Sequence, residues 1–296
     1  MLRVLPPFFA HTHRITWSEI ELINDTADIH HPAVRALLKD WHGPGLELNC
    51  DSDLPARSGL GSSSSFTVGM INALAAIQGR RIGKHALAAE AIRVEQDVIR
   101  EAVGSQDQCH AAFGGFNRID FDATGFRVSP VVLPPADLQN LLDHMLLVFT
   151  GFPRAAAAIE ADKIERMPQN EGALRDIHQQ VDEAAPLLGD PAALGSLLGR
   201  AWRAKRALSP LVAGPAFTAL YAAACAAGAY GGKLLGAGGG GFALFLVAPD
   251  RRAAVKAALG DLIEVPVGID RAGSTVVLYE PDELGPSIKM RSVAFF

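Results

Sequence analysis

Cysteine and aromatic residues are scarce in this chain. Its 296 residues include three cysteines that lie far apart, Cys50, Cys109 and Cys225, and aromatic residues make up only 7%. An odd, scattered set of thiols does not match the framework of a small disulfide-stapled domain, and it favours buried thiols in a reducing compartment. We therefore expect a cytoplasmic protein.

Long apolar runs and a strong excess of charge are also missing. The most apolar stretch, residues 242–248, has the length of a strand, and no run approaches the roughly 20 residues that cross a bilayer. The first nine residues lack the charged, apolar and small-residue blocks of a signal peptide. Lysine and arginine number 27 against 32 aspartates and glutamates, which gives a net charge of −5. We therefore expect neither a membrane nor a nucleic acid as a partner.

The chain does contain enough apolar material for packed cores. Hydrophobic residues make up 49% and charged residues 20%, and at about 150 residues per domain the length predicts two domains. Pro134 and Pro135 separate two regions of regular patterning, so we expect one domain over residues 1–133 and a second over 134–296. Mixed helix and strand signals predict the α+β class.

Local patterns predict the individual elements. Apolar alternation or short apolar runs predict strands over 2–9, 20–23, 46–50, 145–149, 242–247, 263–267 and 274–279, with a strand-rich region over 116–132. A repeat near 3.6 residues predicts helices over 33–41, 66–77, 86–103 and 251–259, and three or four more between 155 and 227.

A loop rich in serine and glycine follows the predicted strand at 46–50 and precedes the apolar helix at 66–77. Small residues let backbone N–H groups converge, and the helix adds the partial positive charge of its N-terminus. A flexible linker is the alternative, but a linker does not sit between a strand and an apolar helix. The pattern predicts a phosphate-binding loop made of Pro55, Ser58, Gly59, Leu60, Gly61, Ser62, Ser63, Ser64 and Ser65.

A second glycine-rich segment covers residues 231–241. Gly236, Gly238 and Gly241 formally match the dinucleotide pattern G-x-G-x-x-G, which should follow a strand and open a helix. Here we expect a helix before the glycines and a strand after them, so the dinucleotide interpretation fails. The glycines indicate a backbone that passes very close to a ligand or to another chain segment.

With both loops identified, the sequence resembles the GHMP family of small-molecule kinases. Residues 55–64 resemble that family's P-x-x-x-G-L-G-S-S-A phosphate loop, and residues 235–242 resemble its C-terminal glycine motif, about 170 residues further on. The resemblance covers roughly residues 1–280. It implies a ribosomal-S5-like N-terminal lobe that binds ATP and a ferredoxin-like C-terminal lobe.

The finer resemblance is to the heptose 7-phosphate kinase branch, through residues 53–66, 95–97, 104–108 and 114–118. It implies ATP-dependent phosphorylation of the C1 hydroxyl of a small sugar phosphate, D-glycero-D-manno-heptose 7-phosphate. The product would be a 1,7-bisphosphate, on the way to nucleotide-activated heptose for lipopolysaccharide or capsule. A fucose- or galactose-type anomeric kinase and a non-catalytic nucleotide- or sugar-binding relative are the alternatives. The resemblance leaves a homodimer open.

The resemblance also implies roles for individual residues. Ser63 and Glu95 match the residues that hold Mg²⁺, and Asp107, twelve residues after Glu95, matches the catalytic base. Taken alone, Glu95 would be interpreted as a solvated helix residue and Asp107 as a helix cap.

Substrate contacts are predicted at two sets of residues. Guanidinium groups match phosphate oxygens, so Arg57, Arg118 and Arg154 are candidates for the second phosphate, although each equally fits a surface arginine. The second set is Gly236, Gly238, Gly239 and Gly240.

One motif of the family is not found. GHMP kinases begin with a segment that resembles A-P-x-R-(I/L)-x-x-x-G-G-G-T-D, and this chain has none before Leu2. Either the start of the chain is set too late, or the chain lacks the motif. In the second case we expect the first strand of the N-terminal lobe to be missing, together with its substrate contacts. This departure favours the non-catalytic alternative, whereas Ser63, Glu95 and Asp107 favour the enzyme.

Overall fold

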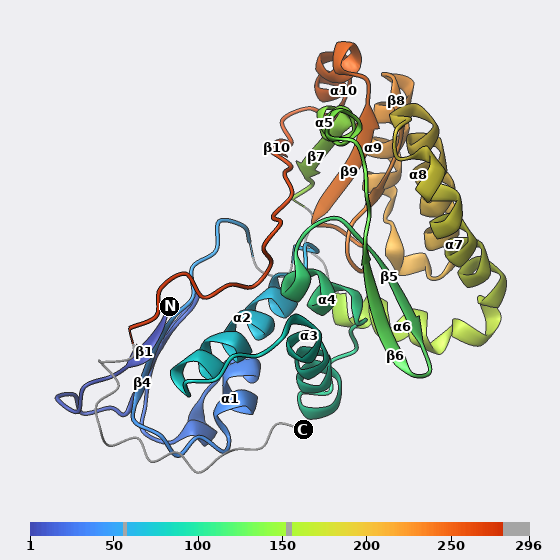
Figure 1. The fold of residues 1–296 in the computed structure, drawn as a ribbon. Coiled ribbons are helices and arrows are strands. Elements are labelled where there is room, and N and C mark those ends of the chain that lie inside the picture. The colour runs from blue at the N-terminus through green and yellow to red at the C-terminus, as the bar shows by residue number, and fades with distance from the viewer. Residues whose placement is uncertain (56–57, 152–155, 281–296) are drawn as a thin grey trace. The chain divides into compact units, whose positions relative to one another are not determined.

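The computed structural model describes residues 1–55, 58–151 and 156–280, and these residues form two compact units (Figure 1). Unit 1 comprises Met1–Ala56, Gly61–Pro130 and the stretch that begins at Asp270. Unit 2 comprises Arg57–Leu60 and Val131–Ile269. The sequence pattern predicts neither the return of the chain to unit 1 nor the short excursion into unit 2.

Unit 1 contains a four-stranded mixed sheet. Its order is β1 (Leu2–Val4), β4 (Leu46–Asn49), β2 (His13–Thr16) and β3 (Ile20–Ile23). The β2 and β4 strands are parallel, and the other neighbours are antiparallel. Within the predicted strand over 2–9, the prolines at 6 and 7 predict either a stop or a bulge, and β1 ends before them, because proline cannot donate to a sheet ladder.

The register of this sheet aligns three charges. Glu47 on β4 is paired with Arg3 on β1 and with Arg14 on β2. Arg3 Nε donates to Glu47 Oε2 at 2.7 Å, and Arg14 Nη1 lies 3.4 Å from Oε1. Burial acts to raise the pKa of Glu47, but the hydrogen bonds and the charges of the two arginines lower it below its usual value. The Glu47 carboxylate on β4 thus forms ion pairs with arginines on both neighbouring strands.

The helices of unit 1 pack in two layers around one central helix. They are α1 (Pro32–Leu38), α2 (Ser62–Ile77), α3 (Lys84–Arg93) and α4 (Gln106–Phe113), with a π-helical turn at Val94–Val98 and a 3₁₀ turn at Thr26–Asp28. Met70 and Leu74 of α2 share a core with the sheet and α1. Val68 and Ile71 of the same helix share a second core with α3 and α4. Because α2 is covered on two sides, its first turn is held firmly.

A hairpin and the returning chain complete unit 1. The hairpin consists of β5 (Asn117–Asp122) and β6 (Gly125–Pro130). The returning chain binds the end of α4, where Ser274 N donates to Ala111 O at 2.8 Å and Gly115 N donates to Asp270 O at 2.6 Å. A Cβ added to Gly114 would lie 2.2 Å from Gly273 N, so the two backbones are in direct contact.

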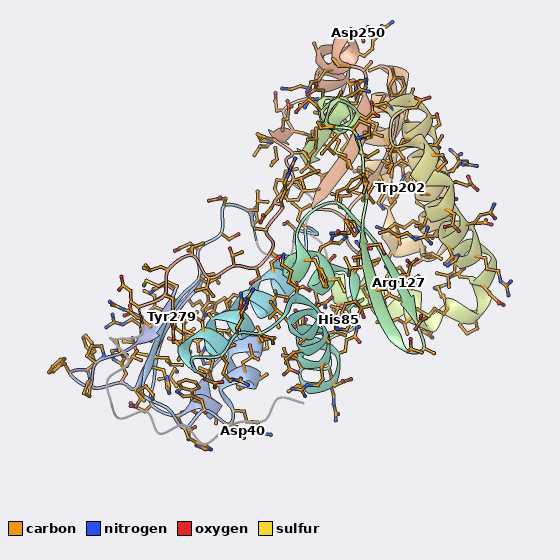
Figure 2. The ribbon with its side chains drawn as sticks, in the orientation of Figure 1. Asp40, His85, Arg127, Trp202, Asp250 and Tyr279 are labelled. Atoms are coloured by element: carbon orange, nitrogen blue, oxygen red, sulfur yellow. The ribbon has the colours of Figure 1, made fainter. Side chains whose placement is uncertain are left out.

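The strand predicted at 274–279 is wrong. Within the described part of the chain these residues pair with no strand. Val277 is 93% exposed, and Tyr279 lies among the elements of unit 1 (Figure 2). The segment is anchored at Ser274 rather than by a sheet ladder, and its valines are exposed, Val276 at 46% and Val277 at 93%.

Unit 2 contains an antiparallel sheet of the order β10 (Ile263–Val265), β7 (Met145–Phe149), β9 (Phe242–Val247) and β8 (Ala229–Leu234). Helices connect β7 to β8, a loop joins β8 to β9, and one helix leads to β10. The order fourth, first, third, second with this βαββαβ connectivity is the ferredoxin-like arrangement. The expected fold of the C-terminal lobe is confirmed.

The helices of unit 2 are α5 (Pro135–His144), α6 (Ala156–Glu165), α7 (Glu171–Ala184), α8 (Pro191–Ala207), α9 (Pro215–Ala226) and α10 (Arg252–Leu259). Short 3₁₀ turns lie at Met167–Gln169, Ala185–Leu187, Pro210–Val212 and Pro249–Arg251. α8 approaches β8 so closely that a Cβ on Gly231 would lie 2.1 Å from Gly195 O. Trp202, labelled in Figure 2, is a residue of α8 and is 1% exposed. Its ring packs edge-on against that of Phe217. In the described part of the chain, none of the helices has the length and apolar character needed to cross a bilayer.

Candidate active site

The predicted phosphate loop is partly helical. α2 begins at Ser62, four residues before the predicted start, so the serines from 62 to 65 form its first turn. Gly61 is the N-cap, with φ of 71°, and no side chain caps the helix. Ser65 N donates to Gly61 O at 2.9 Å, whereas the N–H groups of Ser62, Ser63 and Ser64 have no intrahelical acceptor and remain available to an anion. Earlier in the loop, Pro55 is exposed and Ser58 is buried.

Glu95 is buried beside this first turn and is 1% exposed. Ser64 Oγ donates to Glu95 Oε2 at 2.9 Å, and Gln108 Nε2 donates to the same oxygen. The other carboxylate oxygen, Oε1, is buried and has no hydrogen-bond partner. Glu95 is therefore not the solvated helix residue that its sequence context alone indicates.

A π-helical turn sets the position of Glu95. α3 ends at Arg93 and the wider turn occupies Val94–Val98, where Ile99 N donates to Val94 O and Glu101 N donates to Glu95 O, each at 2.9 Å. The continuous helix predicted over 86–103 is wrong, because the extra residue in this turn breaks its repeat. Such turns occur often at functional sites. Arg100 follows with φ of 63°, and it is the one non-glycine residue with positive φ in the described ranges.

Asp107 lies at the same end of α2. α4 begins at Gln106 with Ser105 as its N-cap, so Asp107 is the second helical residue and not the cap. A Cβ added to Gly61 would lie 3.1 Å from Cβ, Cγ and Oδ2 of Asp107. The carboxylate is exposed. The loop glycine therefore makes room for an accessible acid beside the open N-terminus of α2.

The structure thus brings together Ser64, Glu95 and Gln108, with Asp107 next to the loop. Ser63, the predicted metal ligand, is exposed one residue before Ser64. Gln108 was not predicted as a site residue. The signal was present, because position 108 lies one helical turn before Ala112 on the buried side of α4, where a polar residue needs a reason.

The second glycine-rich segment connects two strands. Its first four residues are the end of β8, and residues 235–241 lead from that strand into β9, which corrects the predicted order of a helix followed by a strand. Four of its glycines have positive φ, namely Gly236, Gly238, Gly239 and Gly241. A helix does not open after it, so the dinucleotide interpretation fails here as well.

Close contact with other chain segments explains two of these glycines. A Cβ on Gly238 would lie 2.7 Å from Val212 O, and one on Gly241 would lie 1.9 Å from Ser58 O. Gly241 O also accepts hydrogen bonds from the N and Oγ1 of Thr150, both at 2.8 Å. At these positions the packing alternative is sufficient. Substrate binding by Gly236, Gly238, Gly239 and Gly240 stays a prediction.

Of the three candidate arginines, one is described. Arg118 Nε donates to Asp120 Oδ1 at 2.8 Å within the β5–β6 hairpin, and this bond lowers the pKa of Asp120. Arg57 and Arg154 lie outside the described residues. Contact of any of the three with a substrate phosphate stays a prediction.

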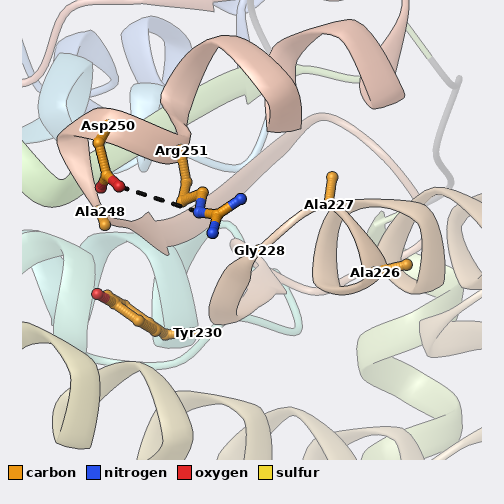
Figure 3. A pocket seen from close by; sticks show the side chains of 7 residues that line it. All are labelled: Ala226, Ala227, Gly228, Tyr230, Ala248, Asp250 and Arg251. Carbon is orange, nitrogen blue, oxygen red and sulfur yellow. Dashed lines mark ion pairs between the residues drawn. The ribbon is translucent and has the colours of Figure 1, made fainter.

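A pocket in unit 2 lies away from its glycine-rich loop. It has a volume of about 390 Å³ and is lined by Ala226, Ala227, Gly228, Tyr230, Ala248, Asp250 and Arg251 (Figure 3). These residues flank the start of β8 and the end of β9, whereas the loop joins the opposite ends of the two strands. At about 3.3 Å per residue the two features are roughly 20 Å apart. The pocket is therefore separate from the glycine motif.

Comparison with known proteins gives consistent matches. The family model for the GHMP kinases N terminal domain matches residues 28–115, and that for GHMP kinases C terminal matches residues 183–264. The D-glycero-alpha-D-manno-heptose 7-phosphate kinase of Campylobacter jejuni is 32% identical over 237 residues, which cover 76% of this chain and 68% of that protein.

Two further relatives are more distant. The L-fucokinase/L-fucose-1-P guanylyltransferase of Bacteroides fragilis is 29% identical over 248 residues, covering 77% of this chain and 25% of that protein. The crystal structure of a D-glycero-D-manno-heptose 1-phosphate kinase from Bacteroides thetaiotaomicron superposes with a TM-score of 0.71 at 22% identity, covering 92% of this chain and 84% of that one. The last likeness concerns the fold alone.

Proposed function

Because the chain belongs to the GHMP kinase family, whose members are phosphotransferases that use ATP, we propose that it phosphorylates the C1 hydroxyl of D-glycero-D-manno-heptose 7-phosphate. The products are ADP and the 1,7-bisphosphate, a precursor of nucleotide-activated heptose for surface polysaccharides. The substrate is supported by the likeness to the Campylobacter enzyme. Assembly as a homodimer stays a prediction.

The observation that carries the proposal is the pairing of two carboxylates at one end of α2. Glu95 is buried with one free oxygen, and Asp107 is exposed against Gly61. A kinase needs both kinds, one to hold a cation near the phosphates and one to take the proton of the acceptor hydroxyl. The uncapped first turn of α2 supplies N–H donors for phosphate oxygens.

The residues present fit Mg²⁺. No group of three or more His, Cys, Asp or Glu side chains suited to a metal occurs within residues 1–55, 58–151 and 156–280. The buried carboxylate of Glu95 remains, and one carboxylate is typical of the sparse oxygen set that Mg²⁺ takes together with substrate phosphates. Glu95 Oε1 would hold it, with Ser63 as the predicted hydroxyl ligand. When bound, Mg²⁺ supplies neutralisation of the phosphate charge.

The chain's own residues then act on the acceptor. Asp107 accepts the proton of the C1 hydroxyl as that oxygen forms its bond to the γ-phosphorus, and the bond from the γ-phosphorus to the bridging oxygen breaks to release ADP. The N–H groups at the start of α2 hold the phosphate oxygens in place. Gly61 keeps Asp107 close to this end of the helix, because a side chain there would crowd the aspartate at 3.1 Å and would strain a backbone with φ of 71°.

The test is ATP-dependent ADP release with D-glycero-D-manno-heptose 7-phosphate and Mg²⁺, compared with a sugar-free blank. We expect turnover in the wild type, and phosphorus NMR should find the new phosphate on C1. Asp107→Asn should lower kcat by about 10²–10⁴-fold with little change in either KM. Near-full turnover of a folded Asp107→Asn chain would remove the base role. A wild type that binds ATP but shows no turnover would favour the non-catalytic alternative.

A fucose- or galactose-type kinase is the second candidate, favoured by the match to the Bacteroides fragilis fucokinase. Such an enzyme needs no site for a second phosphate. L-fucose and D-galactose therefore belong in the same assay. A higher kcat/KM for a free sugar than for the heptose phosphate would replace the proposed substrate with this one.

A further inference from the structure

Gln108 is fully buried, and its two amide atoms have different surroundings. Nε2 donates to Glu95 Oε2, whereas Oε1 is buried without a hydrogen-bond partner. Both atoms belong to one planar amide, so Oε1 lies beside the same carboxylate. Turning the amide over would set its oxygen against the carboxylate oxygen, two acceptors, so the carboxylate selects the orientation with the nitrogen toward it.

Glu95 has a matching free oxygen in Oε1. Glu95 and Gln108, whose side chains are joined by a hydrogen bond, therefore each have one buried acceptor atom without a donor. Buried polar atoms in folded proteins are nearly always satisfied, by protein, by water or by an ion. A pair of acceptors, one of them on a carboxylate, is the arrangement that a cation with its waters completes.

We propose that Gln108 is a positioning residue of the cation site, an inference that rests on the proposed function. Its N–H group holds one oxygen of Glu95, so that the other oxygen faces the cation. Its carbonyl oxygen adds a neutral acceptor to the wall of that site. Gln108 thus sets the direction of the buried carboxylate, and Asp107, the next residue back along α4, is held at the same place.

An unpartnered amide oxygen also occurs on Gln180, so that feature alone does not distinguish Gln108. Gln108 differs because its amide nitrogen donates to a buried carboxylate that itself has an unpartnered oxygen. Gln96 offers a comparison, because its Nε2 donates to Val103 O at 2.9 Å and to Ser105 Oγ at 3.1 Å, and no unsatisfied buried atom occurs on it. The neighbours of Gln108 on the buried side of α4 are the apolar Cys109 and Ala112. An apolar residue at 108 would fill the same space without leaving an acceptor unpaired.

The first experiment measures cation binding without any sugar. Mn²⁺ is titrated by electron paramagnetic resonance into the full chain with a non-hydrolysable ATP analogue, for the wild type, Gln108→Met and Gln106→Met. Gln106 is exposed on the same helix and gives the matched control. We expect the apparent Kd for Mn²⁺ to rise about 10–100-fold in Gln108→Met and to stay unchanged in Gln106→Met. An unchanged Kd in folded Gln108→Met would overturn the proposal.

If Gln108→Met does not fold, Gln108→Glu provides a second test of whether Gln108 belongs to the cation site. Two buried carboxylates side by side repel one another unless a cation lies between them. We expect this variant to have a lower Tm than the wild type without cation, and to gain more Tm than the wild type from Mn²⁺ with the nucleotide analogue. An equal Tm deficit with and without Mn²⁺ would mean that Gln108 only packs.

These measurements separate the two proposals. If the wild type binds Mn²⁺ with the nucleotide but does not phosphorylate the heptose phosphate, the proposed substrate is wrong. The Mn²⁺ affinities of the variants still test the role of Gln108. A wild type that binds no Mn²⁺ together with the nucleotide overturns the role of Gln108 directly.

Discussion

Glu21 and Glu95 are two of the buried glutamates of unit 1, and their carboxylates have different hydrogen-bond partners. Glu21, 5% exposed, accepts hydrogen bonds from Trp17 Nε1 at 2.9 Å and from the backbone N–H groups of His30 and His31 at 2.6 and 3.2 Å. Both of its oxygens are satisfied. Glu95, 1% exposed, has donors on one oxygen only. Donors within the fold satisfy both oxygens of Glu21 but only one oxygen of Glu95. The second oxygen of Glu95 is therefore available to bind a ligand.

Of the substitutions that test this comparison, Glu95→Gln should have the largest effect, on turnover. The substitution keeps the shape and removes the charge, so we expect turnover with ATP and Mg²⁺ to fall by about 10²-fold or more. The free energy of unfolding should stay the same or rise, because an uncompensated buried charge is removed. Steady-state kinetics and urea unfolding measure both. Full activity combined with a loss of stability would make Glu95 a structural residue like Glu21.

Glu21→Met tests the other side of the comparison. Three donors lose their acceptor, so the free energy of unfolding should fall by about 2–3 kcal/mol. The kcat of the folded protein should not change. Glu19→Met is the matched control, because Glu19 is exposed two residues earlier. A change in kcat for Glu21→Met without a change in unfolding would contradict the structural role.

Much of the fold could be predicted from local pattern. β7 and β9 are short apolar runs, so their places follow from composition alone. β8 was missed because it contains Gly231 and Gly232, which are poor strand formers. Their small size is required by the close approach of α8, a contact between distant parts of the chain. Local sequence does not contain that information.

The sequence predicts site residues where a family motif contains them, and it does not predict residues whose role depends on their position in three dimensions. Ser63, Glu95 and Asp107 were selected by family resemblance, whereas the π-helical turn that directs Glu95 leaves the apolar pattern of a helix nearly intact. Gln108 is an ordinary polar residue until its burial is known. Both depend on tertiary packing, which a single sequence shows only as a polar residue on an apolar face.

His13 extends the comparison to a buried base. Its Nδ1 accepts a hydrogen bond from Leu46 N at 3.2 Å, and burial lowers its pKa below the ordinary value of 6.5. The unfolded chain therefore binds a proton at His13 more readily than the folded chain. The stability that the neutral, buried imidazole contributes is fully present above pH 6.5 and is lost as pH falls through the folded-state pKa.

The expected result for His13→Asn, which keeps an acceptor, is a flatter stability profile. Between pH 7.5 and 5.5 the wild type should lose more unfolding free energy than the variant. Chemical denaturation across this pH range measures the difference. Identical slopes would mean that the buried imidazole is protonated at no cost.

Arg100→Gly should give the smallest effect. Left-handed backbone costs a non-glycine residue about 1–2 kcal/mol, and glycine loses about half of that gain through its freedom in the unfolded chain. We expect the free energy of unfolding to rise by about 0.5 kcal/mol with kcat unchanged. A fall in kcat would mean instead that the constrained backbone after the π-helical turn helps to direct Glu95.

The return of the chain to unit 1 has a consequence for synthesis on the ribosome. Lys84 Nζ donates to the carbonyls of Phe113 and Ala272, each at 2.6 Å, and Asn72 Nδ2 donates to Ser274 Oγ at 3.0 Å. These late residues are translated after the whole of unit 2. Domains usually fold in the order in which they emerge, but unit 1 cannot close the end of α4 until unit 2 has left the tunnel. The part of the molecule that is made first is thus completed last.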